Sequence, residues 1–469
     1  MNEILTLSGV ALGRLIGEGS LSSAELVEAH LERIAQVNPA LNAAVEVLAR
    51  QARQGAHAAD VRRSGGALLG PLDGVPFSIK DSIEVAGTSC SAGTLGMRHA
   101  PPSERDATLV ARLRAAGAIP IARTNLPDLL FAFESDNLIH GRTNNPYDLT
   151  RTSGGSSGGE AALIAACGSP FGLGSDAAGS VRLPAHFCGI ASLKPTSGRL
   201  PRTGHVPPSG GWMETLWQIG PMARHVEDLC VMMEVLTGPD GQDHTVVPMP
   251  NGDARAIDAA GLRIAWFADN GIAPPTKETA SLVCNAAQGL NAKECRPPRI
   301  GESYDREMEL IGPDGGDGLR AWLQAAGSTR THPLLQGWLD KLGPYRTNIA
   351  GFGKYWESLY GFRAAMFEFF QDYDAILSPV CATPAVPHGK SIEELTFRGF
   401  SYTMTYNVTG WPAAVVRCGE TPDGLPIDLQ VAAHPWREDV ALAVALRLEQ
   451  LFGGWKAPNP RKSQNVFPG

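Results

Sequence analysis

The chain has 469 residues, of which 43% are hydrophobic and 19% charged, and its formal net charge is −8 at pH 7. This composition is typical of a globular protein with ample material for a core, and the acidic balance argues against a nucleic-acid binder, which would carry a basic surface. No apolar run approaches 18 residues and no basic-then-apolar leader opens the sequence, so we expect a cytoplasmic protein without a membrane span.

The cysteines and histidines do not form recognisable ligand patterns. The eight cysteines are scattered along the chain without a CxxC pair, which is typical of a reduced, cytosolic protein rather than a disulfide framework. The histidines, including His388 and His434, lack metal-ligand spacing such as HExxH. We therefore expect no metal and no other cofactor.

Helices and a strand are predicted in the first part of the chain. Over residues 20–50, Ser22 and Glu25 form a capping box ahead of apolar residues that recur on one face, which predicts a helix packed on the main domain. The segment at 106–117, DATLVARLRAAG, predicts a second helix capped by its aspartate. The run AIPIA at 118–122 predicts a strand directly after it.

Two clusters of glycine and serine stand out, GGSSGG at 154–159 and SDAAGS at 175–180, each followed by an apolar segment. Glycine lets backbone N–H groups approach a ligand closely, and a helix start offers unpaired N–H groups and the positive end of a dipole. Such loops serve as a phosphate cradle, as an oxyanion hole beside a serine nucleophile, or as plain tight turns. Neither cluster has the GxxxxGK[ST] or GxGxxG spacing, so the oxyanion hole and the tight turns stay open.

The second half of the chain is less informative. Residues 197–224 place tryptophans among prolines and glycines, which indicates an ordered loop that either lines a substrate mouth or covers the core. Amphipathic helices are predicted on both sides of the turn cluster GPDGGDG at 312–318. The run from 375 to 389 predicts a strand and a proline-stiffened loop, and residues 405–452 predict closing strands and a last helix.

The segment Ser153–Thr196 resembles the defining segment of the amidase signature family: GGSSGG is followed, after a fixed interval, by GSDAAGSVRLPAHFCGIASLKPT. GVPFSIKD at 74–81 is similar to the family's lysine motif, and RTNNPYD at 142–148 to the run that leads into the serine loop. The similarity extends from about Leu21 to Arg224 and returns more weakly after Tyr373. A match this long and ordered is far more specific than one short pattern.

The resemblance implies a Ser–Ser–Lys triad. Ser180 would be the nucleophile, Lys80 the base, and Ser156 the bridging serine, entered through a cis peptide bond from Gly155. A serine hydroxyl needs a neighbour that takes its proton, and only a neutral lysine can do so. The pKa of Lys80 must therefore lie below its ordinary value of about 10.4, which burial would achieve.

The resemblance also implies an oxyanion hole made by the backbone N–H groups of Ala177, Ala178, Gly179 and Ser180. The family usually has glycine at the position of Ala178, so the shape of this hole and the acyl groups it admits are expected to differ. The positions expected to support the site by fixing its loops are Gly155, Ser157, Asp176 and Arg182.

The alternation of helices and strands predicts an α/β sheet with helices on its faces. The resemblance implies one large domain over residues 1–469 with a mixed central sheet flanked by helices on both faces. Its core is expected at roughly 1–240 and 373–469. The intervening 241–372 is expected to form a variable, helical, substrate-facing cap that sets specificity.

The function implied is hydrolysis of C–N bonds of small amides through a serine acyl-enzyme, extending to carbamates (urethanes) and esters. The alternatives are a glutaminase-type subunit of a tRNA-dependent amidotransferase and a non-catalytic binding relative. Glu160 and the run at 169–176 resemble the fatty-acid-amide branch more than that glutaminase subunit, and the presence of all three triad residues disfavours a dead scaffold.

The expected partner is a small-molecule amide or carbamate, and the protein is expected to be a monomer or homodimer. Apolar side chains near the motifs predict aryl or aliphatic acyl groups over charged ones. The residues predicted to line this pocket are Phe131, Phe133, Trp212 and Met213.

Overall fold

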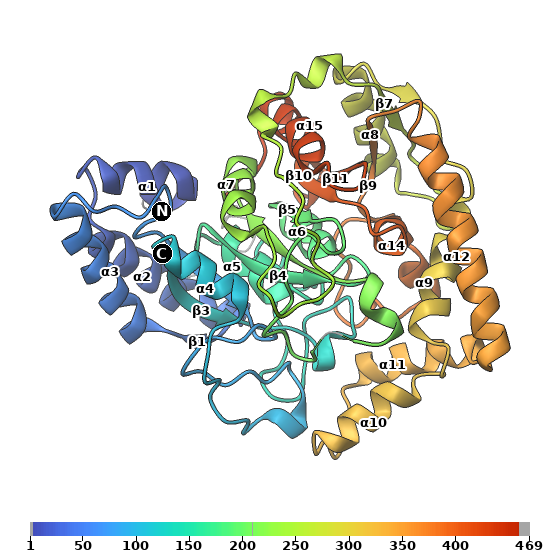
Figure 1. Ribbon diagram of the computed structural model, residues 1–469, viewed down its shortest axis with the longest axis horizontal. Helices are drawn as coiled ribbons and strands as arrows, with labels where there is room; N and C mark the ends of the chain where they lie inside the picture. Colours follow the sequence, from blue (N-terminus) through green and yellow to red (C-terminus); the bar gives the residue numbers. More distant parts are fainter. Residues whose placement is uncertain (1–2, 209, 459–469) are drawn as a thin grey trace.

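The computed structural model describes residues 3–208 and 210–458, and its centre is one mixed β-sheet (Figure 1). Within these residues the sheet has eleven strands, in the order β1–β3–β2–β4–β6–β5–β10–β11–β9–β7–β8. In that order their bounds are β1 (Ala44–Val47), β3 (Ile119–Thr124), β2 (Pro76–Lys80), β4 (Phe171–Asp176), β6 (Gln218–Ala223), β5 (Ala191–Lys194), β10 (Ala413–Glu420), β11 (Pro426–Ala433), β9 (Ala375–Pro379), β7 (Ile264–Trp266) and β8 (Lys293–Glu294).

The sheet mixes parallel and antiparallel pairs. β2 runs parallel to both of its neighbours, β3 and β4. From β4 through β6, β5, β10 and β11 to β9, each strand is antiparallel to the next. At the far edge β7 runs parallel to β9 and β8. The predicted mixed sheet is therefore confirmed.

Helices cover both faces of the sheet, as predicted. One face is buried by α1, α4, α7, α8 and α15, and the other by α2, α5 and α6. Among the described residues, none of the helices is both long enough and apolar enough to cross a bilayer. The helix bounds are α1 (Gly9–Gly17), α2 (Ser23–Leu41), α3 (Ala49–Ser64), α4 (Thr108–Ala115), α5 (Gly158–Ala165), α6 (Arg182–Cys188), α7 (Val226–Leu236), α8 (Lys277–Gly289), α9 (Ser303–Ile311), α10 (Asp317–Ala325), α11 (Pro333–Leu342), α12 (Ile349–Phe369), α13 (Glu394–Arg398), α14 (Ser401–Val408) and α15 (Glu438–Phe452).

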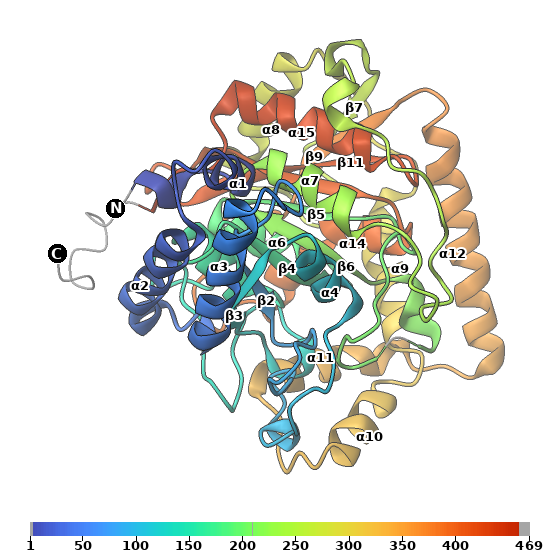
Figure 2. The same cartoon turned by 60° about the vertical axis from the view of Figure 1, so that its left-hand side comes forward.

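The segment 241–372 contributes both helices and strands. It supplies β7 and β8 to the sheet edge and the helices α8 to α12. Its helices α9, α11 and α12 join α13 and α14 in a separate hydrophobic cluster beside the sheet, and α12 runs along the outer edge of the molecule in both views (Figures 1 and 2). The role of this segment as a specificity-setting cap remains a prediction.

The ends of the first predicted helix follow from local hydrogen bonds. The predicted capping box is present at the start of α2, because Glu25 N donates to Ser22 Oγ at 3.1 Å and Ser22 N donates to Glu25 Oε2 at 2.9 Å. The helix ends at Leu41, where Asn42 takes up a left-handed backbone conformation with φ 49°. The predicted extension to residue 50 was wrong, since β1 occupies part of that range.

The second predicted helix is present as α4, and the strands predicted from 118 and from 375 are β3 and β9. The predicted aspartate cap of α4 was wrong. Ala107 is the capping residue and makes no side-chain bond to the helix. Asp106 instead accepts from Ala86 N at 2.8 Å and pairs with Arg114 at 3.1 Å, so its carboxylate ties the helix to a neighbouring loop.

The helix α5 lies close against β4 and β2 because β4 has glycine at position 172. Every residue of α5 is buried. The side chain of its Glu160 passes over Gly172 of β4 toward the neighbouring strand β2. A Cβ on Gly172 would lie 1.8 Å from Glu160 Oε1 and 2.5 Å from the carbonyl oxygen of Ser78. Any side chain at position 172 would collide with α5 and β2, so only glycine fits there.

Replacing Gly172 by alanine is expected to lower the free energy of unfolding by about 1–3 kcal/mol, because overpacking a buried site forces its neighbours to shift. The midpoint of urea denaturation measures this loss. Gly353→Ala in α12 is the matched control, since a Cβ there meets no described atom within 4 Å and alanine favours a helix by about 0.5–1 kcal/mol. Equal losses in the two variants would contradict the close packing of α5.

Candidate active site

The serine loops and the lysine meet at one edge of the sheet. β2 ends at Lys80 and its parallel neighbour β4 ends at Asp176, so both strands deliver their next residues to the same edge. The loop 154–157 leads into α5, and the loop 177–181 leads from β4 into α6. Residues far apart in the chain are thereby brought into one site.

The Lys80 amine is completely buried and is surrounded by hydroxyl groups. Its Nζ lies 2.6 Å from Ser156 Oγ, 3.0 Å from Ser157 Oγ and 3.1 Å from Ser175 Oγ. The carbonyl oxygen of Ser175 lies 3.4 Å away. All of these recorded hydrogen-bond partners are uncharged oxygens, so none of them balances a positive charge on the amine.

Burial lowers the pKa of Lys80 well below its ordinary value, against the opposing attraction of Asp176 and Glu160. Glu160 offers little of that attraction near neutral pH, because burial raises its pKa to about 8 despite hydrogen bonds from Ser78 and Thr124. The site thus favours the neutral amine, which is the form that can accept a proton from a serine.

The serine loop is pressed against the segment that precedes it. The Gly155–Ser156 peptide bond is cis, as the resemblance implied. A Cβ on Gly155 would lie 2.4 Å from the carbonyl oxygen of Ala132 and 2.6 Å from the nitrogen of Glu134. The close approach of these two backbones explains why glycine precedes Ser156.

Ser156 and Ser180 line the same cavity, which has a volume of about 130 Å³. Ser180 is 7% exposed, and its carbonyl oxygen accepts from Ser157 N at 3.1 Å, which joins the two serine loops.

A buried ion pair shapes the loop that carries Ser180. Asp176 accepts from Gly179 N at 2.8 Å and from Val181 N at 3.1 Å, and it pairs with Arg182 at 3.0 Å with both side chains fully buried. Although burial alone would raise the pKa of Asp176, the Arg182 charge and hydrogen bonds from Arg182 and Asn407 hold it far below its usual range. The carboxylate therefore stays ionised and fixes the loop.

Arg182 ties this loop to the C-terminal part of the chain. Its Nη1 donates to the carbonyl oxygen of Thr403 at 2.8 Å, and its Nη2 donates to Asn407 Oδ1 at 2.6 Å. Asn407 Nδ2 in turn donates to Asp176 Oδ1 at 2.8 Å and to the carbonyl oxygen of Leu216 at 2.9 Å. Helix α14 thus clamps the loop that carries Ser180.

The four N–H groups expected in the oxyanion hole differ in whether they already have a hydrogen-bond partner. The N–H of Gly179 donates to Asp176, and a Cβ on Gly179, whose φ is 117°, would lie 2.2 Å from Thr403 Oγ1. Ala177, Ala178 and Ser180 line the cavity, and their N–H groups have no recorded partner in the described part of the chain. Three of the four groups are thus available to a ligand.

Three of the four residues predicted to form the acyl pocket line the cavity, and one does not. Phe131, Phe133 and Met213 line the cavity, whereas Trp212 is not among its lining residues. The Trp212 ring instead packs on Phe352, with ring centroids 6.0 Å apart, and is 38% exposed. Consecutive residues of this short 3₁₀ turn point to different sides, which separates Trp212 from Met213.

The comparison with known proteins identifies the family. The family model described as Amidase matches residues 25–310 and 318–442. The chain belongs to the amidase family. The resemblance inferred from the serine loops is thereby confirmed, and the family makes this protein an amidase-signature hydrolase that acts on amides.

The relatives of this amidase include two kinds of protein. Fatty-acid amide hydrolase 2 of Homo sapiens is 31% identical, over 97% of this chain and 91% of that protein. A glutamyl-tRNA(Gln) amidotransferase subunit of Chloroflexus aggregans is 33% identical, over 95% of this chain and 96% of that protein. A solved structure of fatty acid amide hydrolase has a TM-score of 0.87 at 26% identity, over 96% of this chain and 86% of that one.

Several residues of the site were not predicted from the sequence. Ser175 opens the SDAAGS cluster, and its hydroxyl contacts both Lys80 and His205. His205 is brought to the site only by the folding of the 197–217 loop, so no local sequence pattern predicts that it belongs to the site. Other lining residues without a motif include Leu129, Leu130, Leu216, Trp217, Ile311 and Trp338.

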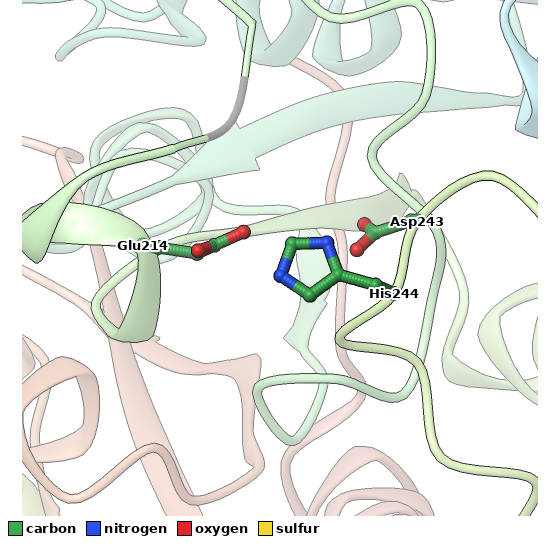
Figure 3. Close-up of side chains that lie close together, drawn as sticks. All are labelled: Glu214, Asp243 and His244. Atoms are coloured by element: carbon green, nitrogen blue, oxygen red, sulfur yellow. The ribbon is translucent and has the colours of Figure 1, made fainter.

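The described residues also contain one group of side chains with metal-ligand chemistry, Glu214, Asp243 and His244 (Figure 3). Both carboxylates are already bonded to Arg202, at 2.9 Å for Glu214 and 3.2 Å for Asp243. A cation would have to displace or repel this guanidinium. The group therefore fits an arginine-centred ion-pair network better than a metal site.

Exchanging Glu160 for glutamine is expected to change how stability depends on pH. The folded protein keeps this proton up to about pH 8, whereas the ordinary pKa is 4.5. Ionisation in the unfolded chain therefore removes stability as pH rises from 4.5 to 8, by up to about 5 kcal/mol. Urea denaturation at several pH values should show this fall in the wild type and a flatter profile in Glu160→Gln.

The control for this prediction is Glu357→Gln, which makes the same exchange at an exposed residue of α12. It should reproduce the wild-type profile. Parallel profiles for the wild type and Glu160→Gln would show that Glu160 does not hold a proton in the folded state.

Proposed function

We propose that this amidase hydrolyses the C–N bond of small amides with aryl or aliphatic acyl groups, through an acyl-enzyme on Ser180. Lys80 is the base and Ser156 relays the proton between them. The observation that carries this proposal is the 2.6 Å contact between the buried Lys80 amine and Ser156 Oγ, in a cavity that Ser180 also lines.

In the first half of the proposed reaction, Ser180 Oγ attacks the carbonyl carbon of the substrate. Its proton passes to Ser156 Oγ as the proton of Ser156 passes to Lys80 Nζ. The C–N bond then breaks, and the leaving nitrogen receives the proton from Lys80 by the same route. Water repeats these steps on the Ser180 ester, which releases the acid and restores the hydroxyl.

The negative charge of each tetrahedral intermediate falls beside the N–H groups of Ala177, Ala178 and Ser180. One such donor typically contributes about 3–4 kcal/mol to the transition state. Gly179 serves differently in this scheme, because its N–H is bound to Asp176 and holds the loop in shape. Asp176 and Arg182 therefore act as positioning residues, and Ser157 supports the Lys80 amine.

The chemistry of the cavity supports apolar acyl groups. Phe131, Phe133 and Met213 line it together with Trp338, and its one carboxylate among the described lining residues, Asp176, is already paired with Arg182. A charged acyl group such as that of glutamine would lose its hydration there without a free partner. Carbamates and esters fit the same scheme, since their carbonyl groups are attacked by the same nucleophile.

The second candidate function is that of a glutaminase-type component of a tRNA-dependent amidotransferase. It is favoured by the 33% identity to the Chloroflexus aggregans protein over nearly the whole chain. The apolar cavity weighs against it, since glutamine carries two charges. A non-catalytic binding role is the weaker alternative, because Lys80, Ser156 and Ser180 are all present.

A fluorophosphonate probe tests the nucleophile. One covalent adduct per chain is expected on the wild type and none on Ser180→Ala, as read by intact mass. Lys80→Ala should label and turn over at least about 100-fold more slowly, since general-base catalysis contributes about 10²–10⁴-fold. The controls Ser64→Ala and Lys390→Ala, which lie outside the cavity, should label like the wild type. Full labelling of Ser180→Ala would refute the assignment.

A substrate panel tests the acyl pocket. An anilide is expected to be cleaved faster than glutamine, and Phe131→Ala should raise the KM for the anilide by roughly 10-fold through lost apolar contact. Phe367→Ala, at an exposed ring on α12, is the matched control and should leave KM unchanged. Faster turnover of glutamine than of the anilide would instead support the amidotransferase-type function.

A further inference from the structure

A buried histidine lies one hydroxyl group away from the Lys80 amine. His205 Nε2 is 3.0 Å from Ser175 Oγ, which is itself 3.1 Å from Lys80 Nζ. The imidazole is 6% exposed, lines the cavity and packs on Trp217 with ring centroids 4.5 Å apart. Its contacts link it to the lysine through Ser175, and no contact with Ser180 is recorded in the described part of the chain.

The backbone holds this histidine in register with the strand that carries Lys80. Immediately after β2, Ser82 accepts from Val206 N at 2.7 Å through its carbonyl oxygen, and Glu84 N donates to the carbonyl oxygen of Gly204 at 2.9 Å. Ile83 forms an antiparallel bridge with His205 itself. His205 is therefore fixed against the short stretch of chain that directly follows Lys80.

The hydrogen bonds of the imidazole determine which nitrogen carries its proton. Nδ1 lies 3.0 Å from the carbonyl oxygen of Pro207, and a carbonyl can only accept. Nδ1 is therefore the donor, and Nε2 has a lone pair. Burial lowers the pKa of His205 to about 3, so Nε2 stays an acceptor at neutral pH and receives the hydroxyl proton of Ser175.

The donors and acceptors around Lys80 then balance. A neutral amine has two N–H donors and one lone pair, and the hydroxyls of Ser157 and Ser175 can accept the two N–H groups. The Ser157 hydroxyl has its own acceptor in the carbonyl oxygen of Ser175 at 3.3 Å. With the Ser175 proton held by His205, the lone pair of Lys80 is left for Ser156.

We propose that His205 is a positioning residue of the reaction: by accepting the hydroxyl proton of Ser175, it keeps Ser175 an acceptor toward Lys80 and reserves the lysine lone pair for Ser156. Without this acceptor the Ser175 hydroxyl turns its proton toward Nζ and competes with Ser156. The inference rests on the proposed role of Lys80 as the base.

A second hydroxyl provides the matched control. Ser82 Oγ also lies within reach of His205 Nε2, at 3.1 Å, but no contact between Ser82 and Lys80 is recorded in the described part of the chain. Ser82→Ala therefore removes a partner of the histidine without touching the lysine. In a plot of kcat/KM against pH, the acidic limb of this variant should coincide with that of the wild type.

The test is the pH profile of kcat/KM on an anilide for His205→Phe, which keeps the ring packing and removes the acceptor. We expect kcat to fall about 10-fold or more with KM nearly unchanged. The acidic limb should move to lower pH by about 0.5–1 unit, because a hydroxyl that donates to Nζ stabilises the neutral amine. His205→Gln, whose amide oxygen can accept from Ser175, should recover most of the loss.

Other charged groups near this network are common to all the variants. Asp176 and Glu160 act on Lys80, and Arg202 near His205 is paired with Glu214 and Asp243. In a Ser175→Ala background, His205→Phe should move the limb no further, since the histidine acts through that hydroxyl. This double-mutant comparison remains decisive if either single variant is less stable.

Three results would overturn the inference. The first is an acidic limb of His205→Phe at the same pH as that of the wild type, and the second is a kcat of His205→Gln no higher than that of His205→Phe. The third is an equal shift of the acidic limb when His205→Phe is made in the Ser175→Ala background. Failure of the proposed function has a different signature. A wild type that neither forms a fluorophosphonate adduct nor turns over any amide removes the base assignment, and with it the role of His205.

Discussion

The site depends on removing a lysine amine from water without giving it a counter-ion. Ordinary buried lysines are paired, because an isolated ammonium inside a protein is very unfavourable. Here Lys80 is completely buried and meets Ser156, Ser157 and Ser175, so burial favours the uncharged amine. The hydroxyl groups tolerate that state because each can donate or accept.

The nearby carboxylates are arranged so that they do not undo this effect. Asp176 is held by Arg182 and by loop N–H groups, so its charge is largely neutralised locally. Glu160 sits deeper, receives hydrogen bonds from Ser78 and Thr124, and keeps its proton to about pH 8. One carboxyl thus shapes the loop as an anion, and the other fills space as a neutral acid.

The predictability of this site follows from the range of the interactions involved. Lys80, Ser156 and the Ser180 loop lie in ordered local motifs; the alternation of helices and strands predicted an α/β sheet, and the family resemblance implied that it is mixed. The capping box of α2 was readable because its bonds span three residues. Conversely, His205 and Trp338 enter the site through tertiary packing of segments without motifs. Trp212 was predicted to line the cavity like its neighbour Met213 but does not, because adjacency in sequence does not determine where a side chain points.

The clamp between α6 and α14 has a consequence for biosynthesis. The proposed nucleophile and base lie in the first 180 residues, but the partners that hold Arg182 and Asp176 include Thr403 and Asn407. A ribosome-bound chain therefore carries every reactive group long before its geometry is fixed. The site becomes organised only after residues 403–407 have been synthesised, so a nascent chain that stops before them lacks the contacts that fix the Ser180 loop.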